Sequence, residues 1–309
     1  MIVFMRTITP IFLLIGAGFL SRKMEFLKSG DERVLSAYVY YFALPTLFLV
    51  DMSETSYDEE TIRFMIAGII PVFVALIIHI ALCLVFGFSK NTLYLLIIST
   101  VFGSLAFFGI PFITFAFPTM QAEHMATLAA ASIAPASVAI SITALELYKL
   151  GEVTIGEGLK LVVKRLSRNP LIISILCGIL LSVTGIVVPL PLSTPLHMLG
   201  GTTSTVAIFM LGVFLYGRTY TNTVEALKLS LLRMVFLPII ALFTTKLLNL
   251  PDVERATLVL MHGMPLAISM IILGERYDFY KETIASLILI SSIGAGAYLN
   301  LWLWVLRYL

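Results

Sequence analysis

Residues 92–117 read TLYLLIISTVFGSLAFFGIPFITFAF, and residues 257–274 read TLVLMHGMPLAISMIILG. Both stretches are apolar, and both carry a Gly-x-Pro sequence, at Gly109-Ile110-Pro111 and at Gly263-Met264-Pro265. Proline lacks an N–H and clashes with the carbonyl four residues earlier, so each stretch is predicted to form two half-helices. In hydrocarbon, the backbone groups freed at such a break must be met by protein or water. These two matching breaks decide the predicted fold.

The composition predicts a membrane protein without a cofactor. Hydrophobic residues make up 59% of the 309 residues and charged residues 12%, whereas soluble domains are roughly a quarter charged. Cys83 and Cys177 both lie in apolar runs, so no disulfide framework and no metal cluster is expected. The net charge of +2 gives no reason to expect nucleic acid. The first apolar run leads directly into Arg22-Lys23 and further apolar sequence, which indicates an anchor that is not cleaved.

The chain is predicted to be an all-α polytopic membrane protein with ten apolar spans, each close to the length that a bilayer requires. The spans are 5–21, 34–52, 64–87, 92–117, 125–148, 170–188, 197–217, 230–248, 257–274 and 283–306. The longest polar interval divides them into two sets of five. We therefore expect a first five-helix repeat at 1–149, a cytoplasmic linker at 150–169 and a second repeat at 170–309. The mixture of Leu, Val, Lys and Arg in Gly151–Arg168 fits a short amphipathic helix on the membrane surface, or a plain linker.

Lys and Arg predict the orientation of the spans. Counted through ten spans, fifteen of the 20 Lys and Arg residues fall on one side and five on the other. The richer side, which includes Arg233, is predicted to be cytoplasmic, so both termini are expected outside the cell membrane. Because a five-span half ends on the side opposite its start, the second half should be inverted relative to the first. Broken helices in corresponding positions of inverted repeats are typical of secondary transporters.

Several short motifs resemble the auxin efflux carrier family over essentially the whole chain. They are Phe42-Ala43-Leu44-Pro45, Phe108-Gly109-Ile110-Pro111-Phe112, Arg168-Asn169-Pro170, Leu211-Gly212-Val213-Phe214, and Gly263-Met264-Pro265 with Tyr277 twelve residues later. The resemblance, which extends to prokaryotic malate- and malonate-type permeases, implies two inverted five-helix repeats whose fourth and ninth helices cross at the two prolines. It also implies a scaffold domain, a transport domain that moves against it, and a homodimer.

The sequence departs from the plant members of the family at two places. Seven residues before the first proline those carriers have an asparagine that meets a carboxylate-bearing substrate, and here the position is Ser104. Early in the third span they have an acidic residue, and here the sequence is Ala67-Gly68-Ile69-Ile70. Auxin itself is therefore not the expected substrate.

The breaks are predicted to bind a small organic anion. A half-helix that begins beyond Pro111 or Pro265 presents free amide donors and about half a positive charge, and both favour a carboxylate. Near the breaks, the hydroxyl groups that could donate to an anion or accept from a coupling cation are Ser99, Thr100, Ser104 and Ser269. Alternatively, each hydroxyl bonds to its own helix carbonyl four residues back. The expected substrate-binding set also contains Gly109, Pro111, Gly263 and Pro265.

Few ionisable residues lie inside the apolar spans. His262, directly before Gly263, is predicted either to hold the substrate or coupling proton, or to bond to a free carbonyl of the break. His79 is expected to make an interhelical hydrogen bond. Glu146 lies close to Lys149, which favours an ion pair at the membrane surface. No arginine is expected at membrane depth, so none is available to clamp a dicarboxylate.

Other classes of protein fit the sequence less well. No His-Glu-x-x-His, Gly-x-Ser-x-Gly or paired intramembrane aspartates are present, so an enzyme is not expected. An ion channel would need a polar ring within a pore. A sodium-coupled organic-anion symporter of the bile-acid type shares the inverted ten-helix plan. It would need Asn, Gln or Glu at the crossover, and neither broken span contains Asn, Gln, Asp or Glu.

Overall fold

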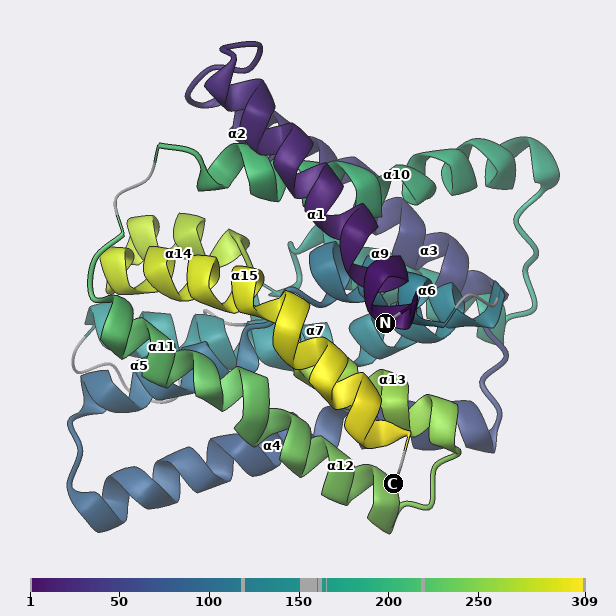
Figure 1. Ribbon diagram of the computed structural model, residues 1–309. Helices are drawn as coiled ribbons and strands as arrows, with labels where there is room; N and C mark the ends of the chain where they lie inside the picture. Colours follow the sequence, from purple (N-terminus) through teal and green to yellow (C-terminus); the bar gives the residue numbers. More distant parts are fainter. Residues whose placement is uncertain are drawn as a thin grey trace. The chain divides into compact units, whose positions relative to one another are not determined.

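The computed structural model describes residues 2–117, 120–150, 160, 163–164, 166–217 and 220–307, and these residues form helices and connecting segments only. The all-α prediction is confirmed for this part of the chain (Figure 1). The α-helices are α1 (Ile2–Lys23), α2 (Asp31–Tyr38), α3 (Leu44–Glu54), α4 (Glu59–Phe86), α5 (Lys90–Val101), α6 (Ile110–Ala116), α7 (Met120–Leu150), α9 (Pro170–Val183), α10 (Leu190–Leu215), α11 (Thr223–Leu231), α12 (Leu237–Leu247), α13 (Asp252–His262), α14 (Ser269–Tyr277) and α15 (Lys281–Leu306). Three π-helical turns join them: η1 (Val39–Ala43), η2 (Leu105–Gly109) and η3 (Leu232–Phe236).

Each of the ten predicted spans overlaps a single helix or two or three consecutive helical pieces. Among the described residues, six helices are long and apolar enough to cross a membrane: Asp31–Glu54, Glu59–Phe86, Gln121–Lys149, Leu190–Leu215, Thr223–Leu247 and Lys281–Leu306. Leu105–Ala116 and Pro170–Val183 are shorter apolar helices. The number, length and apolarity of these helices are those of a multi-pass membrane protein. Most of the predicted amphipathic segment, including 151–159, lies outside the described residues.

Polar side chains mark where several helices begin. Asn169 accepts a hydrogen bond from the Leu171 N–H at 2.9 Å, and Pro170 occupies the first turn of α9. An oxygen-bearing N-cap followed by proline is a preferred helix start, because proline has no N–H to leave unpaired. Asp58 caps α4 in the same way through the Thr61 N–H at 2.8 Å, and this hydrogen bond lowers the pKa of the Asp58 carboxyl group. The Arg168-Asn169-Pro170 motif is thus a helix start.

Each of the three π turns is closely followed by a proline. The turns η1, η2 and η3 end two residues before Pro45, Pro111 and Pro238, respectively. A π turn bonds each N–H one residue further back than an α-helix does, so it accommodates a residue that cannot donate. The carbonyl that Pro238 leaves free in α-helical register, that of Met234, accepts from the Trp302 indole N–H at 2.7 Å. The helices therefore continue through these prolines, as α11, η3 and α12 do in Figure 1.

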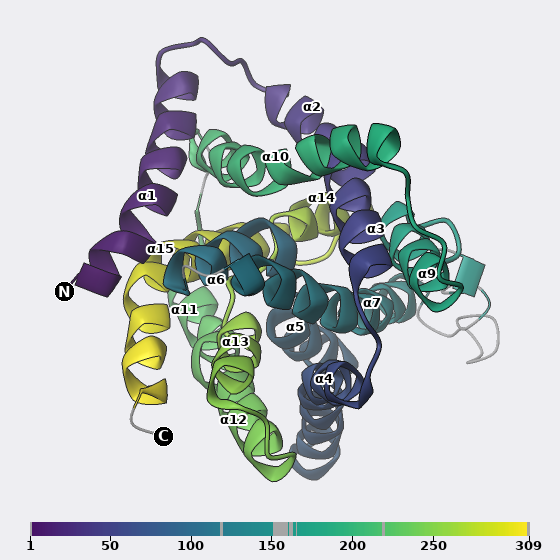
Figure 2. The same ribbon diagram turned by 90° about the vertical axis from the view of Figure 1, so that its right-hand side faces the viewer.

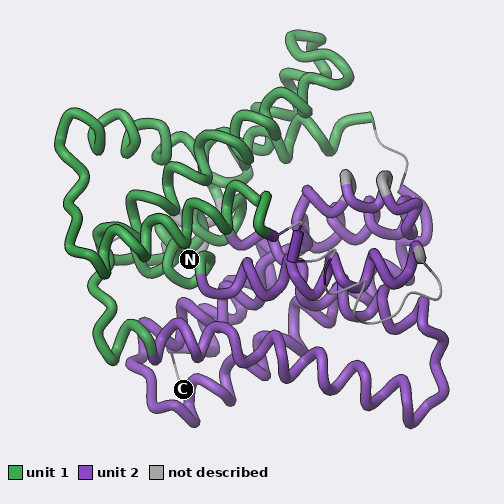
Figure 3. The backbone as a smooth tube through the Cα atoms, turned by 180° about the vertical axis from the view of Figure 1, so that it is seen from behind, with its two compact units in different colours: residues 1–62, 106–131, 167–218 green, residues 63–105, 132–166, 219–309 purple. Residues whose placement is uncertain are grey.

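The chain forms two compact units, and neither unit coincides with one half of the sequence. Unit 1 comprises residues 1–62, 106–131 and 167–218, and unit 2 comprises residues 63–105, 132–166 and 219–309 (Figure 3). Each unit therefore combines helices from the predicted first repeat with helices from the predicted second repeat. In unit 2, α12 packs beside α13 (Figure 2), and α11 packs beside α15.

Glycines allow the helices of unit 1 to approach closely. A Cβ atom added to Gly212 on α10 would lie 1.9 Å from the Ile15 carbonyl oxygen on α1, and one added to Gly18 would lie 2.0 Å from the Phe209 carbonyl oxygen. Small residues at such crossings bring helix backbones into contact, which is a principal source of packing energy within membranes. The Leu211-Gly212-Val213-Phe214 motif therefore contains a packing position, Gly212.

Gly212→Ala should destabilise the protein by about 1–3 kcal/mol, because the added methyl group has no space and the helices must separate. Its matched control is Gly201→Ala on the same helix, since a Cβ atom at Gly201 meets nothing within 4 Å. The control should melt at or slightly above the wild-type temperature, because alanine is the better helix former. Thermal unfolding of the two detergent-purified variants measures the difference. Equal melting temperatures would contradict the close α1–α10 contact.

Candidate functional site

Two helix breaks are present, but only the second lies where the sequence predicts it. The second separates α13 from α14 over Gly263–Ile268, as predicted. The first separates α5 from η2 at Phe102, Gly103 and Ser104. The prediction of a break at Gly109-Ile110-Pro111 is wrong, because the π turn η2 accommodates Pro111 within the continuous helix Leu105–Ala116. No partial positive charge of a helix start is therefore available just beyond Pro111.

The two unwound segments pair with each other inside unit 2. The Ser104 N–H donates to the Pro265 carbonyl at 2.8 Å, and the Ala267 N–H donates to the Phe102 carbonyl at 3.0 Å. These two bonds form an antiparallel bridge between Gly103 and Leu266. This pairing at Gly103 and Leu266, called the crossover below, involves the carbonyl of Pro265 but not Pro111.

Side chains satisfy further backbone groups at this crossover. The Leu266 N–H, which points away from the bridge, donates to the Ser291 hydroxyl on α15 at 3.2 Å. Leu266 and Ser291 are both buried. Because an unpaired backbone group in hydrocarbon destabilises a fold by several kcal/mol, this bond from α15 supports the unwound conformation.

Arg233 is fully buried at the crossover. It lies in η3 and is 1% exposed. Its Nε donates to the Met264 carbonyl in the second break at 2.7 Å, and its Nη1 donates to the Thr100 carbonyl in the last turn of α5. The guanidinium group therefore bridges the two broken helices.

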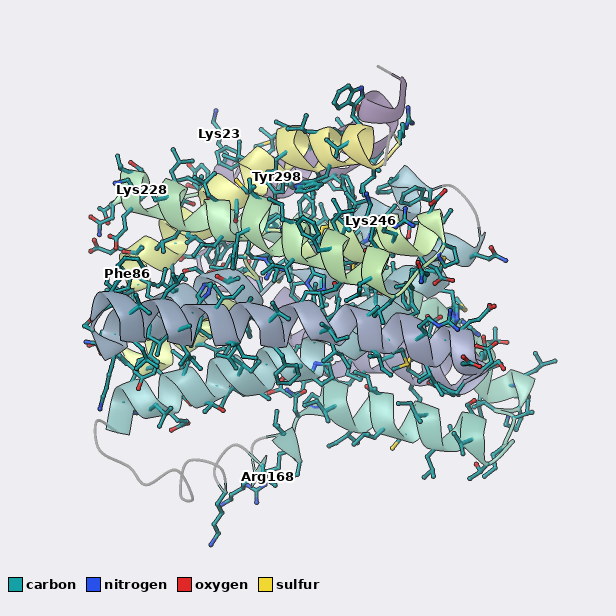
Figure 4. All side chains as sticks on the ribbon, turned by 90° about the horizontal axis from the view of Figure 1, so that it is seen from below. Lys23, Phe86, Arg168, Lys228, Lys246 and Tyr298 are labelled. Atoms are coloured by element: carbon teal, nitrogen blue, oxygen red, sulfur yellow. The ribbon has the colours of Figure 1, made fainter. Side chains whose placement is uncertain are left out.

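The prediction that no arginine lies at membrane depth is wrong. Arg233 follows the start of the Thr223–Leu247 helix by ten residues, which places it about 15 Å along the helix axis. Lys228 and Lys246 lie toward the two ends of this helix (Figure 4). The charge count placed Arg233, with Lys228, on the cytoplasmic side of the membrane. The sequence signal that identifies it is an arginine with apolar neighbours, five residues before the proline that causes a π turn.

The backbone around Arg233 carries partial negative charge, opposite in sign to the charge of the guanidinium group. Thr100 lies in the last turn of α5, and Met264 lies two residues beyond the end of α13. The C-terminal end of a helix carries about half a negative charge, so two such ends meet the guanidinium. Among the described residues, no Asp or Glu forms an ion pair with Arg233. Gly103 leaves the necessary space, since a Cβ atom there would lie 1.8 Å from Nη2.

The other predicted site residues fall into two groups. Ser99, Thr100, Ser104, Gly263 and Pro265 lie at or beside the crossover in unit 2, as do His262 and Ser269. Gly109 and Pro111 belong to unit 1. Ser269 begins α14 and is half-buried, whereas Ser99 and Ser104 are buried.

Thr100 bonds both to its own helix and to a neighbouring one. Its hydroxyl donates to the Leu96 carbonyl four residues back at 2.8 Å, as the structural alternative predicted. It also lies 2.8 Å from His79 Nε2 on α4. Since the single hydroxyl proton is used on Leu96, the imidazole is the donor to Thr100. The expected interhelical bond of His79 is thus present and adjoins the carbonyl that Arg233 binds.

His262 is fully buried and bonds to a neighbouring helix. Its exposed fraction is 0%, and its Nε2 lies 2.9 Å from the Gly68 carbonyl oxygen on α4. A carbonyl accepts only, so Nε2 carries a proton. Within the described part of the chain, Nδ1 has no hydrogen-bond partner. The acceptor of His262 is therefore a carbonyl of α4, whereas the structural alternative predicted a carbonyl of the break.

Glu146 and Tyr277 form a second buried polar contact in unit 2. Glu146 of α7 is 3% exposed, and its carboxylate accepts from the Tyr277 hydroxyl at the end of α14. Lys149 places its ammonium group 5.7 Å from the centre of the Tyr277 ring. The sequence favoured a Glu146–Lys149 pair at the surface, and the tyrosine, 131 residues away in the chain, was not foreseen as the partner. Within the described part of the chain, no group of His, Cys, Asp and Glu could hold a metal ion.

Comparison with known proteins agrees with the motifs. Residues 3–303 match the family described as "Membrane transport protein". An uncharacterized transporter of Methanocaldococcus jannaschii is 23% identical, with 98% of each chain covered. The uncharacterized transporter YfdV of Escherichia coli is 20% identical, also with 98% of each chain covered. Because the match covers nearly the whole sequence, the chain belongs to the membrane transport protein family, also known as the auxin efflux carrier family.

Proposed function

We propose that this protein is a secondary active transporter that moves a small organic anion, a carboxylate, across the cell membrane by alternating access. The observation that carries the proposal is the pairing of two unwound segments, each within a broken apolar helix, through Gly103 and Leu266. Non-helical backbone at membrane depth occurs where it is buried in protein or lines a cavity, and in secondary transporters paired broken helices form the substrate site. A family of transporters, as opposed to enzymes, agrees with this role.

The arrangement of the helices supports the inverted-repeat architecture. Unit 1 contains predicted spans 1, 2, 6 and 7, and unit 2 contains spans 3, 8, 9 and 10 with most of span 5, while span 4 is divided between the two units. Spans 1 and 6, 2 and 7, and 3 and 8 therefore share a unit, and so do span 10 and most of span 5. The family resemblance assigns one such unit the role of scaffold, through which a homodimer forms, and the other the role of transport domain. In this proposal unit 2, which contains the paired breaks, is the transport domain.

The chemistry of unit 2 favours an anion. The helix α14 begins at Ser269, immediately after the second break, and its first N–H groups carry partial positive charge. A carboxylate is the small ligand that such a helix start binds best. The buried hydroxyl groups of Ser99 and Ser104 supply further donors on the side of the first break.

The sodium-coupled alternative receives less support. Sodium sites in proteins use oxygen ligands from carbonyls, carboxylates and amides. The two break segments contain no Asn, Gln, Asp or Glu, and the guanidinium group of Arg233 binds the carbonyls of Thr100 and Met264. A coupling proton therefore fits the proposal better than sodium does, with both termini outside the cell as Lys and Arg predict.

A carboxylate substrate should raise the melting temperature of the detergent-purified protein. A ligand that binds only the folded state stabilises it by about 2.7 kcal/mol at one hundred times its Kd. We expect a response among small mono- and dicarboxylates and no response to the amide of the same acid, which has the same shape without the charge. Stabilisation by amides or amines, with none by any acid, would contradict an anion site.

Pro265→Ala should reduce transport of the identified acid in reconstituted vesicles, while Pro111→Ala should leave transport close to the wild-type rate. Alanine at 265 restores an N–H, and α13 and α14 can then join and close the site. Alanine at 111 changes a helix that is already continuous. Both variants should fold, as gel filtration checks. A larger loss in Pro111→Ala than in Pro265→Ala would place the working break at Gly109–Pro111.

His262→Gln should preserve folding and leave the pH profile of transport unchanged, because the glutamine amide can donate to the Gly68 carbonyl as Nε2–H does. His262→Leu has similar bulk but no donor, so its melting temperature should fall relative to His262→Gln. Transport measured between about pH 5 and 8 covers the range in which a histidine changes charge. A flattened profile in His262→Gln alone would instead assign the coupling proton to His262.

A further inference from the structure

The two carbonyls that Arg233 binds are the ones that the helix breaks leave free. In an uninterrupted helix the Thr100 carbonyl would accept from the Ser104 N–H, but that N–H donates to Pro265 instead. The Met264 carbonyl lies in the segment between α13 and α14, where no helix continues. Arg233 therefore satisfies one released acceptor from each break.

Released carbonyls at the C-terminal ends of half-helices are also the groups that coordinate a coupling cation in transporters with broken helices. Two helix ends together carry about one negative charge, which a single monovalent cation offsets. The guanidinium group supplies that charge here. It also fills the space beside Gly103, since a Cβ atom at that residue would lie 1.8 Å from Nη2.

The arginine is held in place from several directions. The π turn η3 carries it into the core, and the Met234 carbonyl next to it accepts from the Trp302 indole N–H at 2.7 Å. Thr100 is in turn bound by His79 of α4. Being covalently part of the chain, the guanidinium group cannot dissociate into solution as a free cation can.

We propose that Arg233 is a resident cation, which occupies the carbonyl site between the two broken helices so that this carrier needs no sodium ion. The role in transport rests on the proposed function, but the occupancy of the carbonyl site does not. A side chain that replaces the ion keeps the positive charge at the crossover in every conformation. The site then binds its anion without a co-bound metal cation.

The test compares melting temperatures in sodium, potassium and choline chloride at equal ionic strength, with no substrate present. The wild type should melt at the same temperature in all three salts. Arg233→Ala should melt several degrees lower and should recover, in a saturable way, when methylguanidinium is added, because this ion can re-enter the vacated site. Arg255→Ala is the matched control: Arg255 also bonds a carbonyl, that of Leu250, and the exposed Asp252, but at the start of α13. It should not respond to methylguanidinium.

A saturable, sodium-specific rise in the melting temperature of the wild type would overturn the proposal. The proposal would also fail if Arg233→Ala folds and methylguanidinium raises its melting temperature no more than it raises that of Arg255→Ala. If Arg233→Ala yields no folded protein, Arg233→Lys decides, because it retains the charge. Equal melting temperatures of Arg233→Lys in the three salts support the resident cation, and stabilisation by sodium contradicts it. Because these measurements use no substrate, failure to find a transported acid would leave their outcome unaffected.

Discussion

A backbone N–H or C=O group that loses its helical hydrogen-bond partner inside hydrocarbon needs another partner. This requirement determines how the broken helices of unit 2 are arranged. The two unwound segments exchange two hydrogen bonds, between Ser104 and Pro265 and between Phe102 and Ala267. Two breaks that pair are each more stable than one break alone, because each provides acceptors and donors for the other. Ser291 supplies a further acceptor, and Arg233 provides donors for two of the remaining carbonyls.

The π turn explains how a charged side chain reaches this position. The same device precedes Pro45, Pro111 and Pro238, whereas the prolines inside α1, α4, α7 and α10 have no π turn before them. An inserted residue changes the face that the preceding side chains occupy by about 100°, one residue of helical rotation. Of the three turns, only η3 contains a charged residue. Pro238 and Arg233 thus act together, since the proline favours the turn in which the arginine lies.

The sequence predicted the helices well because a bilayer imposes a simple rule of length and apolarity. It also predicted the second break, where Gly263 and Pro265 act on a short helix with no π turn before it. The first break was misplaced because Gly103 and Ser104 give only a weak indication of a helix break. Pro111 is a strong predictor of a break, but the π turn η2 accommodates this proline within a continuous helix. Arg233 was missed because the charge count treats every Lys and Arg as a boundary marker. The partnership of Glu146 with Tyr277 depends on tertiary packing and has no local signature.

In the proposed function, the distribution of charge at the crossover explains why a positively charged side chain need not touch the substrate. Arg233 donates to two helix-end carbonyls, and the partial negative charges of these two helix ends together offset about one positive charge. What remains uncompensated is the N-terminal end of α14, which begins at Ser269. For the anion that we propose as substrate, the attraction then comes from backbone N–H groups, which any sequence would supply. In this proposal the side chains around them, such as Ser99 and Ser104, discriminate among anions, and they can change without disturbing the pairing of the breaks.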